Sequence, residues 1–168
     1  MGYVNDTQMS AFTQPEDCVG TVGTWAMAVA SNVWSLNKNA ANDTSVVKIP
    51  LRLPANAAAL KGALLKSVDI WFSNGTADND AVSAAVYKTT LGAQAAAVTA
   101  AVVATTYDTG HDAAAERITQ AAHKMTLTLT TPVWVDDDTP YHVELTVDAG
   151  ASSVVKIMGA RANYTLRV

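Results

Sequence analysis

The chain has 168 residues, a formal net charge of −4 and 15% charged residues, against roughly 25% in an average soluble protein. Its 37 Leu, Ile, Val and Phe residues, together with the small net charge, exclude global disorder. No apolar run reaches 18 residues, and the first ten residues lack the zones of a signal peptide, so we expect neither a membrane span nor a leader. Lys and Arg are scattered singly, which excludes the basic stripe of a nucleic-acid-binding protein.

Residues 1–43 are rich in Asn, Thr, Ser and Gly with weak periodicity, so we expect an extended N-terminal arm. From Thr44 onward apolar residues recur every second position, as in half-buried strands. Because Pro50 cannot donate a backbone hydrogen bond, the first strand should lie at an edge or break there. Gly159 is expected to form a bulge in the last strand. We predict strands over 47–53, 67–72, 81–91, 125–135, 141–147 and 154–168, a strand or extended segment over 95–106, and one helical turn over 112–118.

Seven or eight strands with polar connections predict an all-β protein. The long connections favour a jelly-roll-like antiparallel β-sandwich over a simple meander. We therefore expect two parts, the arm of residues 1–43 and a β-sandwich domain of residues 44–168.

No catalytic pattern stands out in the sequence. The histidines His111, His123 and His142 lie far apart without metal-ligand spacing, and no glycine-rich phosphate loop precedes a helix. The single Cys18 excludes an intramolecular disulfide. We expect no enzyme activity and no cofactor, unless the fold brings two histidines and an aspartate together beside a pocket.

Acidic residues gather in three predicted connections, where a hard cation such as calcium would find oxygen ligands. No EF-hand spacing occurs, and Asp in such connections commonly caps a turn. Turn capping is the favoured interpretation and a structural calcium ion is the alternative. The candidate ligands are Asp78, Asp80, Asp108, Asp112, Asp136 and Asp138.

The four tryptophans are candidate partner-binding residues. Trp71 and Trp134 fall on the face opposite the apolar stripe of their strands, and Trp25 and Trp34 lie in the predicted arm. Exposed large apolar side chains mark interaction surfaces. We expect these rings to be covered by the arm or by another subunit, and a sugar-stacking platform is the alternative.

The outward-facing positions carry Thr, Ser and Ala with few charges, whereas a free sandwich usually protects its faces and edges with charge. This composition predicts that companion chains cover part of the surface. A homo-oligomer follows, most simply a closed ring such as a trimer.

Four segments resemble uncharacterised phage structural proteins: 23–25 (GTW), 32–36 (NVWSL), 48–54 (KIPLRLP) and 159–166 (GARANYTL). The resemblance implies a bacteriophage virion surface component, first a non-enzymatic capsid decoration (cement) protein on the capsid protein lattice, otherwise a tail or fibre component. The predicted arm holds one Lys before Asp43, which favours the capsid exterior over a position against the genome. A carbohydrate-binding module and an extracellular filament subunit are the alternatives.

Overall fold

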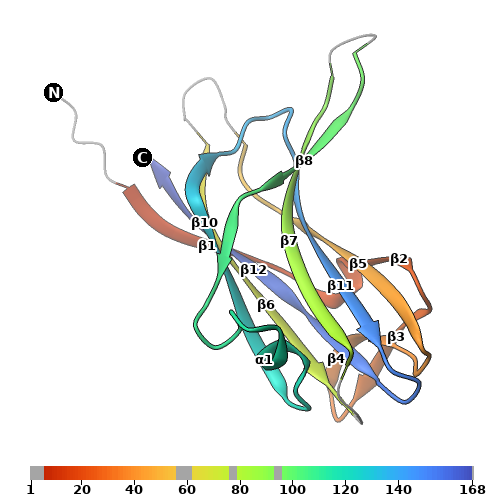
Figure 1. Ribbon diagram of the computed structural model, residues 1–168. Helices are drawn as coiled ribbons and strands as arrows, with labels where there is room; N and C mark the ends of the chain where they lie inside the picture. The colour runs from red at the N-terminus through yellow and green to blue at the C-terminus, as the bar shows by residue number, and fades with distance from the viewer. Residues whose placement is uncertain (1–5, 56–61, 76–78, 93–95, 168) are drawn as a thin grey trace, which may run out of the picture.

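The computed structural model describes residues 6–55, 62–75, 79–92 and 96–167. Two antiparallel sheets pack face to face as a β-sandwich, which confirms the predicted fold class (Figure 1). The strands are β1 (Asp6–Thr13), β2 (Val19–Val22), β3 (Trp25–Ala30), β4 (Val33–Lys38), β5 (Asp43–Leu51), β6 (Ala63–Asn74), β7 (Ala81–Thr90), β8 (Thr99–Val103), β9 (Thr105–Tyr107), β10 (Ala122–Trp134), β11 (Tyr141–Ala149) and β12 (Val155–Arg167). A 3-10 turn, η1 (Pro15–Asp17), and a short helix, α1 (Ala114–Ile118), complete the fold.

Eight strands follow the jelly-roll order, four in each sheet: β4-β12-β6-β10 and β5-β11-β7-β8. The remaining strands extend these sheets, since β3 pairs with β4, β9 with β10, β1 with β12, and β2 with β5. The result is a seven-stranded and a five-stranded sheet.

Strand alternation builds the core between the sheets. Val47 and Ile49 of β5 are fully buried and face Leu145 and Val143 of β11 in register. The inward positions of β6 and β10, including Phe72, are likewise buried. Apolar residues at every second position place one face of each strand inside, which is why the two-residue period predicted these strands.

Two local expectations met different outcomes. Gly159 has φ +119° where the pairing of β12 with β6 shifts register, so the predicted bulge is confirmed. Strand β5 is not an edge strand, because β2 and β11 flank it. Its pairing with β2 covers only residues 46–48, however, so Pro50 lies beyond the end of β2. The hydrogen bonds between these two strands therefore do not need an N–H at Pro50.

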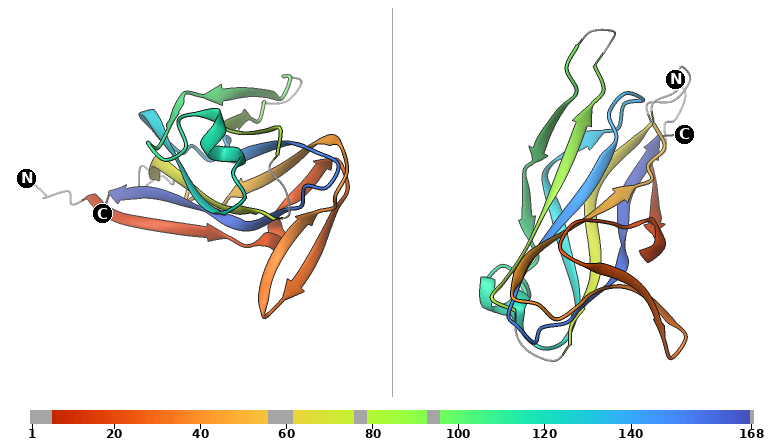
Figure 2. Two further views of the ribbon diagram at one scale, coloured as in Figure 1. Left: turned by 60° about the horizontal axis from the view of Figure 1, so that its bottom comes forward. Right: turned by 90° about the vertical axis from the view of Figure 1, so that its right-hand side faces the viewer.

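The described residues of 6–43 do not stand apart from the sandwich. Strand β1 pairs along residues 160–167 of β12, β2 pairs with β5, and β4 is the first strand of the jelly roll itself. Figure 2 shows the β3–β4 hairpin projecting from the body of the sandwich. Strand β5 begins at Asp43, one residue before the expected start of the sandwich at 44, and the division into two parts stays a prediction. Contact of this segment with a neighbouring subunit stays a prediction.

Candidate binding site

An open groove, here called the aromatic groove, lies where the end of β1 and η1 approach the β3–β4 hairpin and β12. Its volume is about 450 Å³. The residues that line it are Phe12, Gln14, Pro15, Glu16, Val33, Trp34 and Met158. Most of them belong to the N-terminal segment, so the return of that segment onto the sandwich creates the groove.

Gly159 allows this close approach. A Cβ atom built at Gly159 would lie 2.3 Å from the carbonyl oxygen of Thr13 and 2.8 Å from the ring of Phe12. Only glycine combines the positive φ of this bulge with such contact. The bulge therefore lets β1 press against β12 and places the Phe12 ring at the groove.

The groove combines flat rings with polar groups. Trp34 is 56% exposed and Phe12 is 43% exposed. Gln14 and Glu16, both exposed, carry an amide and a carboxylate along the same lining. Exposed aromatic side chains beside a few polar groups are typical of ligand sites.

Trp71 continues the aromatic groove onto the outer face of the seven-stranded sheet. Its ring centroid lies 5.7 Å from that of Phe12. The guanidinium of Arg161 lies 5.1 Å and the ammonium of Lys124 5.8 Å from the centre of the Trp71 ring. The Trp71 ring therefore makes cation–π contacts with two basic side chains. The sequence alone suggested an open ring on which a sugar could stack.

Asp69 organises the polar groups on this outer face. Its side chain is almost fully buried, and its Oδ2 accepts hydrogen bonds from Arg161 Nη2 at 2.7 Å and Asn163 Nδ2 at 3.2 Å. Its Oδ1 accepts one from the Thr126 hydroxyl at 2.7 Å. Burial alone would raise the pKa of Asp69, but these hydrogen bonds and the nearby Lys124 charge outweigh it and lower the pKa. The carboxylate stays ionised and fixes the Arg161 side chain over Trp71.

The other two tryptophans lie away from the groove lining. Trp25 is half-buried, packs against the core, and donates from its indole nitrogen to the Val22 carbonyl oxygen at 2.8 Å. Trp134 is half-buried and pairs with Leu64 across β10 and β6. Its side chain is not free, because it interacts with another residue. Of the four predicted partner-binding tryptophans, the structure links Trp34 and Trp71, through Phe12.

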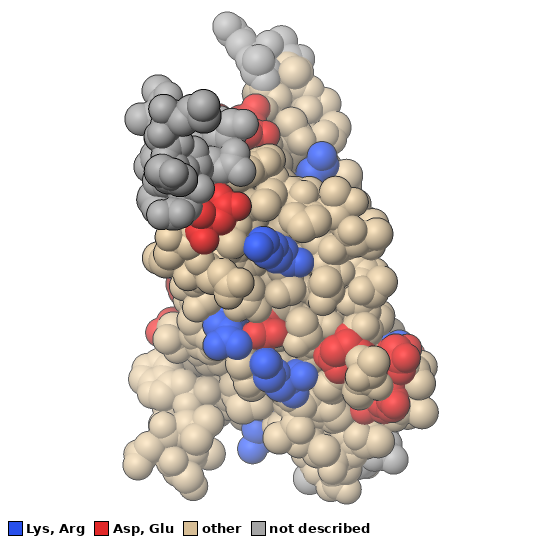
Figure 3. Space-filling model, turned by 90° about the vertical axis from the view of Figure 1, so that its left-hand side faces the viewer, with Lys and Arg blue, Asp and Glu red and all other residues tan. Residues whose placement is uncertain are grey.

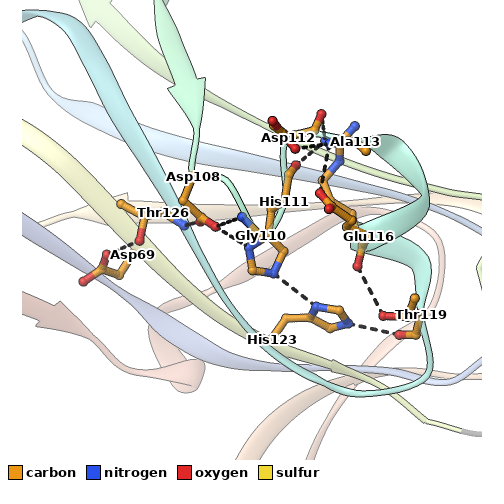
Figure 4. A network of polar contacts seen from close by, with 11 residues as sticks. Asp69, Asp108, Gly110, His111, Asp112, Ala113, Glu116, Thr119, His123 and Thr126 are labelled. Carbon is orange, nitrogen blue, oxygen red and sulfur yellow. Dashed lines mark hydrogen bonds and ion pairs between the residues drawn. The ribbon is translucent and has the colours of Figure 1, made fainter.

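Two histidines and an aspartate do meet, between β10 and the loop before α1 (Figure 4). His111 Nδ1 lies 2.8 Å from Asp108 Oδ1, and His111 Nε2 lies 3.2 Å from His123 Nδ1. His123 Nε2 lies 3.0 Å from the carbonyl oxygen of Thr119. Asn74 Nδ2 also lies 3.4 Å from His123 Nε2, so an aspartate, two imidazoles and an amide form one continuous polar chain.

This network is built as a structural clamp. Every ring nitrogen of His111 and His123 has a protein partner, and both rings are buried. Asn74 donates to the Arg117 and Thr119 carbonyl oxygens at 3.0 Å each, which ties β6 to α1 and to the residue that follows it. Neither His111 nor His123 lines the aromatic groove.

The third histidine, His142, lies on the other sheet, where its ring stacks on Tyr87 with centroids 5.4 Å apart. Burial, reinforced by the Lys48 charge and opposed by Glu144, lowers the pKa of His142. His142 thus faces outward, as its alternation with core positions predicts.

The acidic candidates mostly serve the backbone. Asp108 accepts from the N–H of Gly110 and Thr126, and Asp112 accepts from the Ala113 N–H. Asp138 accepts from the Thr139 hydroxyl. Burial would raise the pKa of Asp108, but the backbone and His111 hydrogen bonds lower it overall.

Asp80 and Asp136 also lie in connections, and Asp78 lies outside the described residues. Within the described part of the chain, no three His, Cys, Asp or Glu side chains are grouped to hold a metal ion. The contacts fit turn capping, and a calcium site that includes Asp78 stays a prediction.

Sequence reasoning missed Phe12, Asn74 and the grouping around Asp69. Phe12 gave no signal, because its position depends on β1 pairing with β12, 150 residues further along the chain. Asn74 gave no signal either, because its partners Arg117 and Thr119 lie more than 40 residues further along the chain. Asp69 and Arg161 both occupy outward positions of their strands, but their pairing follows only from the β12–β6 register.

The comparisons with known proteins describe fold similarity. No protein-family model matches the chain, and no curated protein matches it in sequence. Among solved structures, TmCBM61 in complex with β-1,4-galactotriose is 9% identical with a TM-score of 0.37, over 96% of this chain and 88% of that chain. The enzymatically active domain of bacteriophage CBA120 tailspike protein 4 is 7% identical with a TM-score of 0.40, over 93% of this chain and 19% of that chain.

A third similar structure is the carbohydrate esterase vb_24B_21 from Shiga toxin-encoding bacteriophage phi24B. It is 12% identical with a TM-score of 0.38, over 95% of this chain and 99% of that chain. At such identities and TM-scores the similarities carry no argument about what this chain binds. In the described part of the chain, no helix is long and apolar enough to cross a membrane.

Proposed function

We propose that the chain is a non-catalytic binding module that recognises carbohydrate through the aromatic groove. The observation that carries this proposal is that two exposed rings, Trp34 and Phe12, line one groove together with Gln14 and Glu16. Sugar rings present apolar C–H faces that stack on flat aromatic side chains, and hydroxyl groups that bond to amides and carboxylates. Carbohydrate binding was an alternative from the sequence alone, and the groove favours it over capsid decoration.

The groove supports binding more than hydrolysis. Glycoside hydrolysis uses two carboxyl groups that flank the scissile bond. Glu16 is the one carboxylate among the residues that line the groove in the described part of the chain. The buried histidine pair uses all its ring nitrogens internally and does not line the groove.

Titration calorimetry against a panel of neutral and acidic polysaccharides tests the proposal. We expect saturable binding, with Trp34→Ala weakening it at least tenfold, because a central aromatic contact contributes about 1.4 kcal/mol or more. Val102→Ala is the matched control, since Val102 is equally exposed but belongs to β8 of the other sheet. A panel without any binder, or unchanged binding by Trp34→Ala, would contradict the proposal.

A second candidate function is assembly with other protein chains at an outer surface, such as a phage virion. It is favoured by two strands at sheet edges whose apolar side chains are exposed, with Met27 and Val29 on β3 and Val102 on β8. Uncharged edge strands tend to be covered by a partner. Capsid decoration, a tail or fibre position and a trimeric ring all belong to this candidate.

Light scattering across a concentration series tests assembly. We expect a mass above one chain in the parent and a lower mass in Val102→Lys, because a charge on the edge opposes strand pairing. A parent that stays monomeric at all concentrations would count against self-assembly.

A further inference from the structure

We propose that the carbohydrate recognised by this chain is acidic, and that Lys124, Lys156 and Arg161 beside the aromatic groove bind its carboxylate or sulfate groups. This inference rests on the proposed function and narrows its ligand class. The three cations project from β10 and β12, on the outer face of the seven-stranded sheet.

Strand register groups the three cations around one ring. Lys124 is paired with Trp71 across β10 and β6, and both Lys124 and Arg161 lie over that ring. Lys156 is paired with Ser73, two residues along β6 from Trp71, which corresponds to about 7 Å. The cations therefore form one cluster about Trp71.

The cluster carries more positive charge than its neighbours neutralise. Asp69 is the acidic residue within ion-pair distance of Arg161 and Lys124, at 2.7 and 3.8 Å. Three cations against one carboxylate leave a formal excess of +2, in a chain whose net charge is −4. Figure 3 shows Lys and Arg side chains gathered over the middle of one face around an acidic group.

Among the described residues, the ion pairs that these cations make all go to Asp69. Asp108, which follows β9, is engaged by His111 Nδ1 and by the backbone N–H groups of Gly110 and Thr126. Glu16 lies on the aromatic groove rather than among the three cations. An anionic group that enters beside Trp71 would therefore meet net positive charge.

The cluster borders the aromatic groove from two directions. Phe12 lines the groove and contacts Trp71, on which Arg161 and Lys124 rest. Val33 and Met158 line both the groove and a second hollow of about 320 Å³ that also contains Lys156. A glycan that stacks on Trp34 and Phe12 thus places its neighbouring units beside cations, and charge there selects acidic sugars.

Matched polysaccharide pairs that differ in charge test the inference. The first pair is oligogalacturonate and its full methyl ester, which masks each carboxylate while keeping the sugar. The second pair is dextran sulfate and dextran, which separates sulfate from carboxylate recognition. Dissociation constants are measured at low and at high salt for the parent and for the double variant Lys124→Gln/Lys156→Gln. Arg161 stays unchanged, because its loss would leave the buried Asp69 carboxylate without its main partner.

We expect at least one acidic member to bind about tenfold more tightly than its neutral partner, with the difference reduced at high salt. The double variant should lose about tenfold in affinity for that member, roughly threefold per lysine. Lys48→Gln is the control, since it removes a similarly exposed lysine from the other sheet. Thermal unfolding of each variant verifies that it remains folded.

Two negative outcomes are distinguishable. If the neutral and acidic polysaccharides bind equally and the double variant has the affinity of the parent, the acidic specificity is wrong. Carbohydrate binding itself still holds in that case if Trp34→Ala weakens the affinity. If no member of either pair, and none of the calorimetry panel, binds at all, the proposed function and this inference both fail.

Discussion

Replacing Asp69 by alanine removes the acceptor around which the outer face of the seven-stranded sheet is organised. Arg161 donates two hydrogen bonds to this carboxylate, and Thr126 and Asn163 donate one each. The side chain is only 3% exposed, so water reaches it poorly. Its removal leaves these donors on β10 and β12 without their shared partner.

The free energy of unfolding should fall by about 2–3 kcal/mol. A hydrogen bond to a charged group contributes about 1.5–3 kcal/mol. The Arg161 side chain is partly exposed, however, so solvent replaces much of what its two bonds supply, and the sum of all four would overestimate the loss. For a chain of this length the expected change corresponds to a fall in Tm of roughly 5–10 °C.

Urea unfolding followed by circular dichroism measures this change. Asp69→Asn keeps the shape and one acceptor oxygen, so its loss should be intermediate between the parent and Asp69→Ala. Asp137→Ala, at an exposed position, should stay within about 0.5 kcal/mol of the parent. An Asp69→Ala variant as stable as the Asp137→Ala control would refute the central role of Asp69.

Three further predictions concern other parts of the molecule. The pKa values of Asp69 and Asp108 lie below the ordinary 3.8 in the folded chain, so both carboxylates stabilise the fold at a pH above their unfolded-state pKa. The urea midpoint should therefore drop as the pH falls below about 5. The drop should be less steep in Asp69→Asn, which lacks one of the two carboxylates. Gly159→Ala should lower stability by about 2 kcal/mol or more in thermal unfolding, because the new Cβ would collide with the Thr13 carbonyl; an unchanged Tm would mean that β1 does not pack as described. Burial, with the nearby Asp17 and Glu16, raises the pKa of Cys18 to about 12, so iodoacetamide at pH 8 should label it only after unfolding, and rapid labelling of the folded chain would contradict this.

Local periodicity accounts for the strands that could be predicted. Positions such as Val47 and Ile49, or Val143 and Leu145, alternate with polar residues because one face of each strand is buried against the other sheet. Such alternation is visible in a short window of sequence. The alternation is weak in residues 6–43. Strand β2 is exposed at every position and β3 at most of its positions, so no buried stripe marks either segment as a strand.

The candidate site was only partly visible in the same way. An outward Trp71 could be read from alternation, whereas Trp34 could only be assigned to the predicted arm. The sequence offered no means to see that Arg161 and Lys124 lie over the Trp71 ring, or that Phe12, which lines the groove with Trp34, contacts that ring. Those contacts join residues that are distant in the chain.

The sequence by itself determined the class of the fold, a sandwich of antiparallel strands, because burial of one strand face imposes a two-residue period that needs no knowledge of partners. Tertiary structure alone decided which strands are neighbours, and with them the return of residues 6–43 onto both sheets, the aromatic groove, the cations around Trp71 and the histidine pair. The physical reason is that strands pair through backbone N–H and C=O groups. Because these groups are alike in all residues except proline, the sequence carries little record of which strand pairs with which.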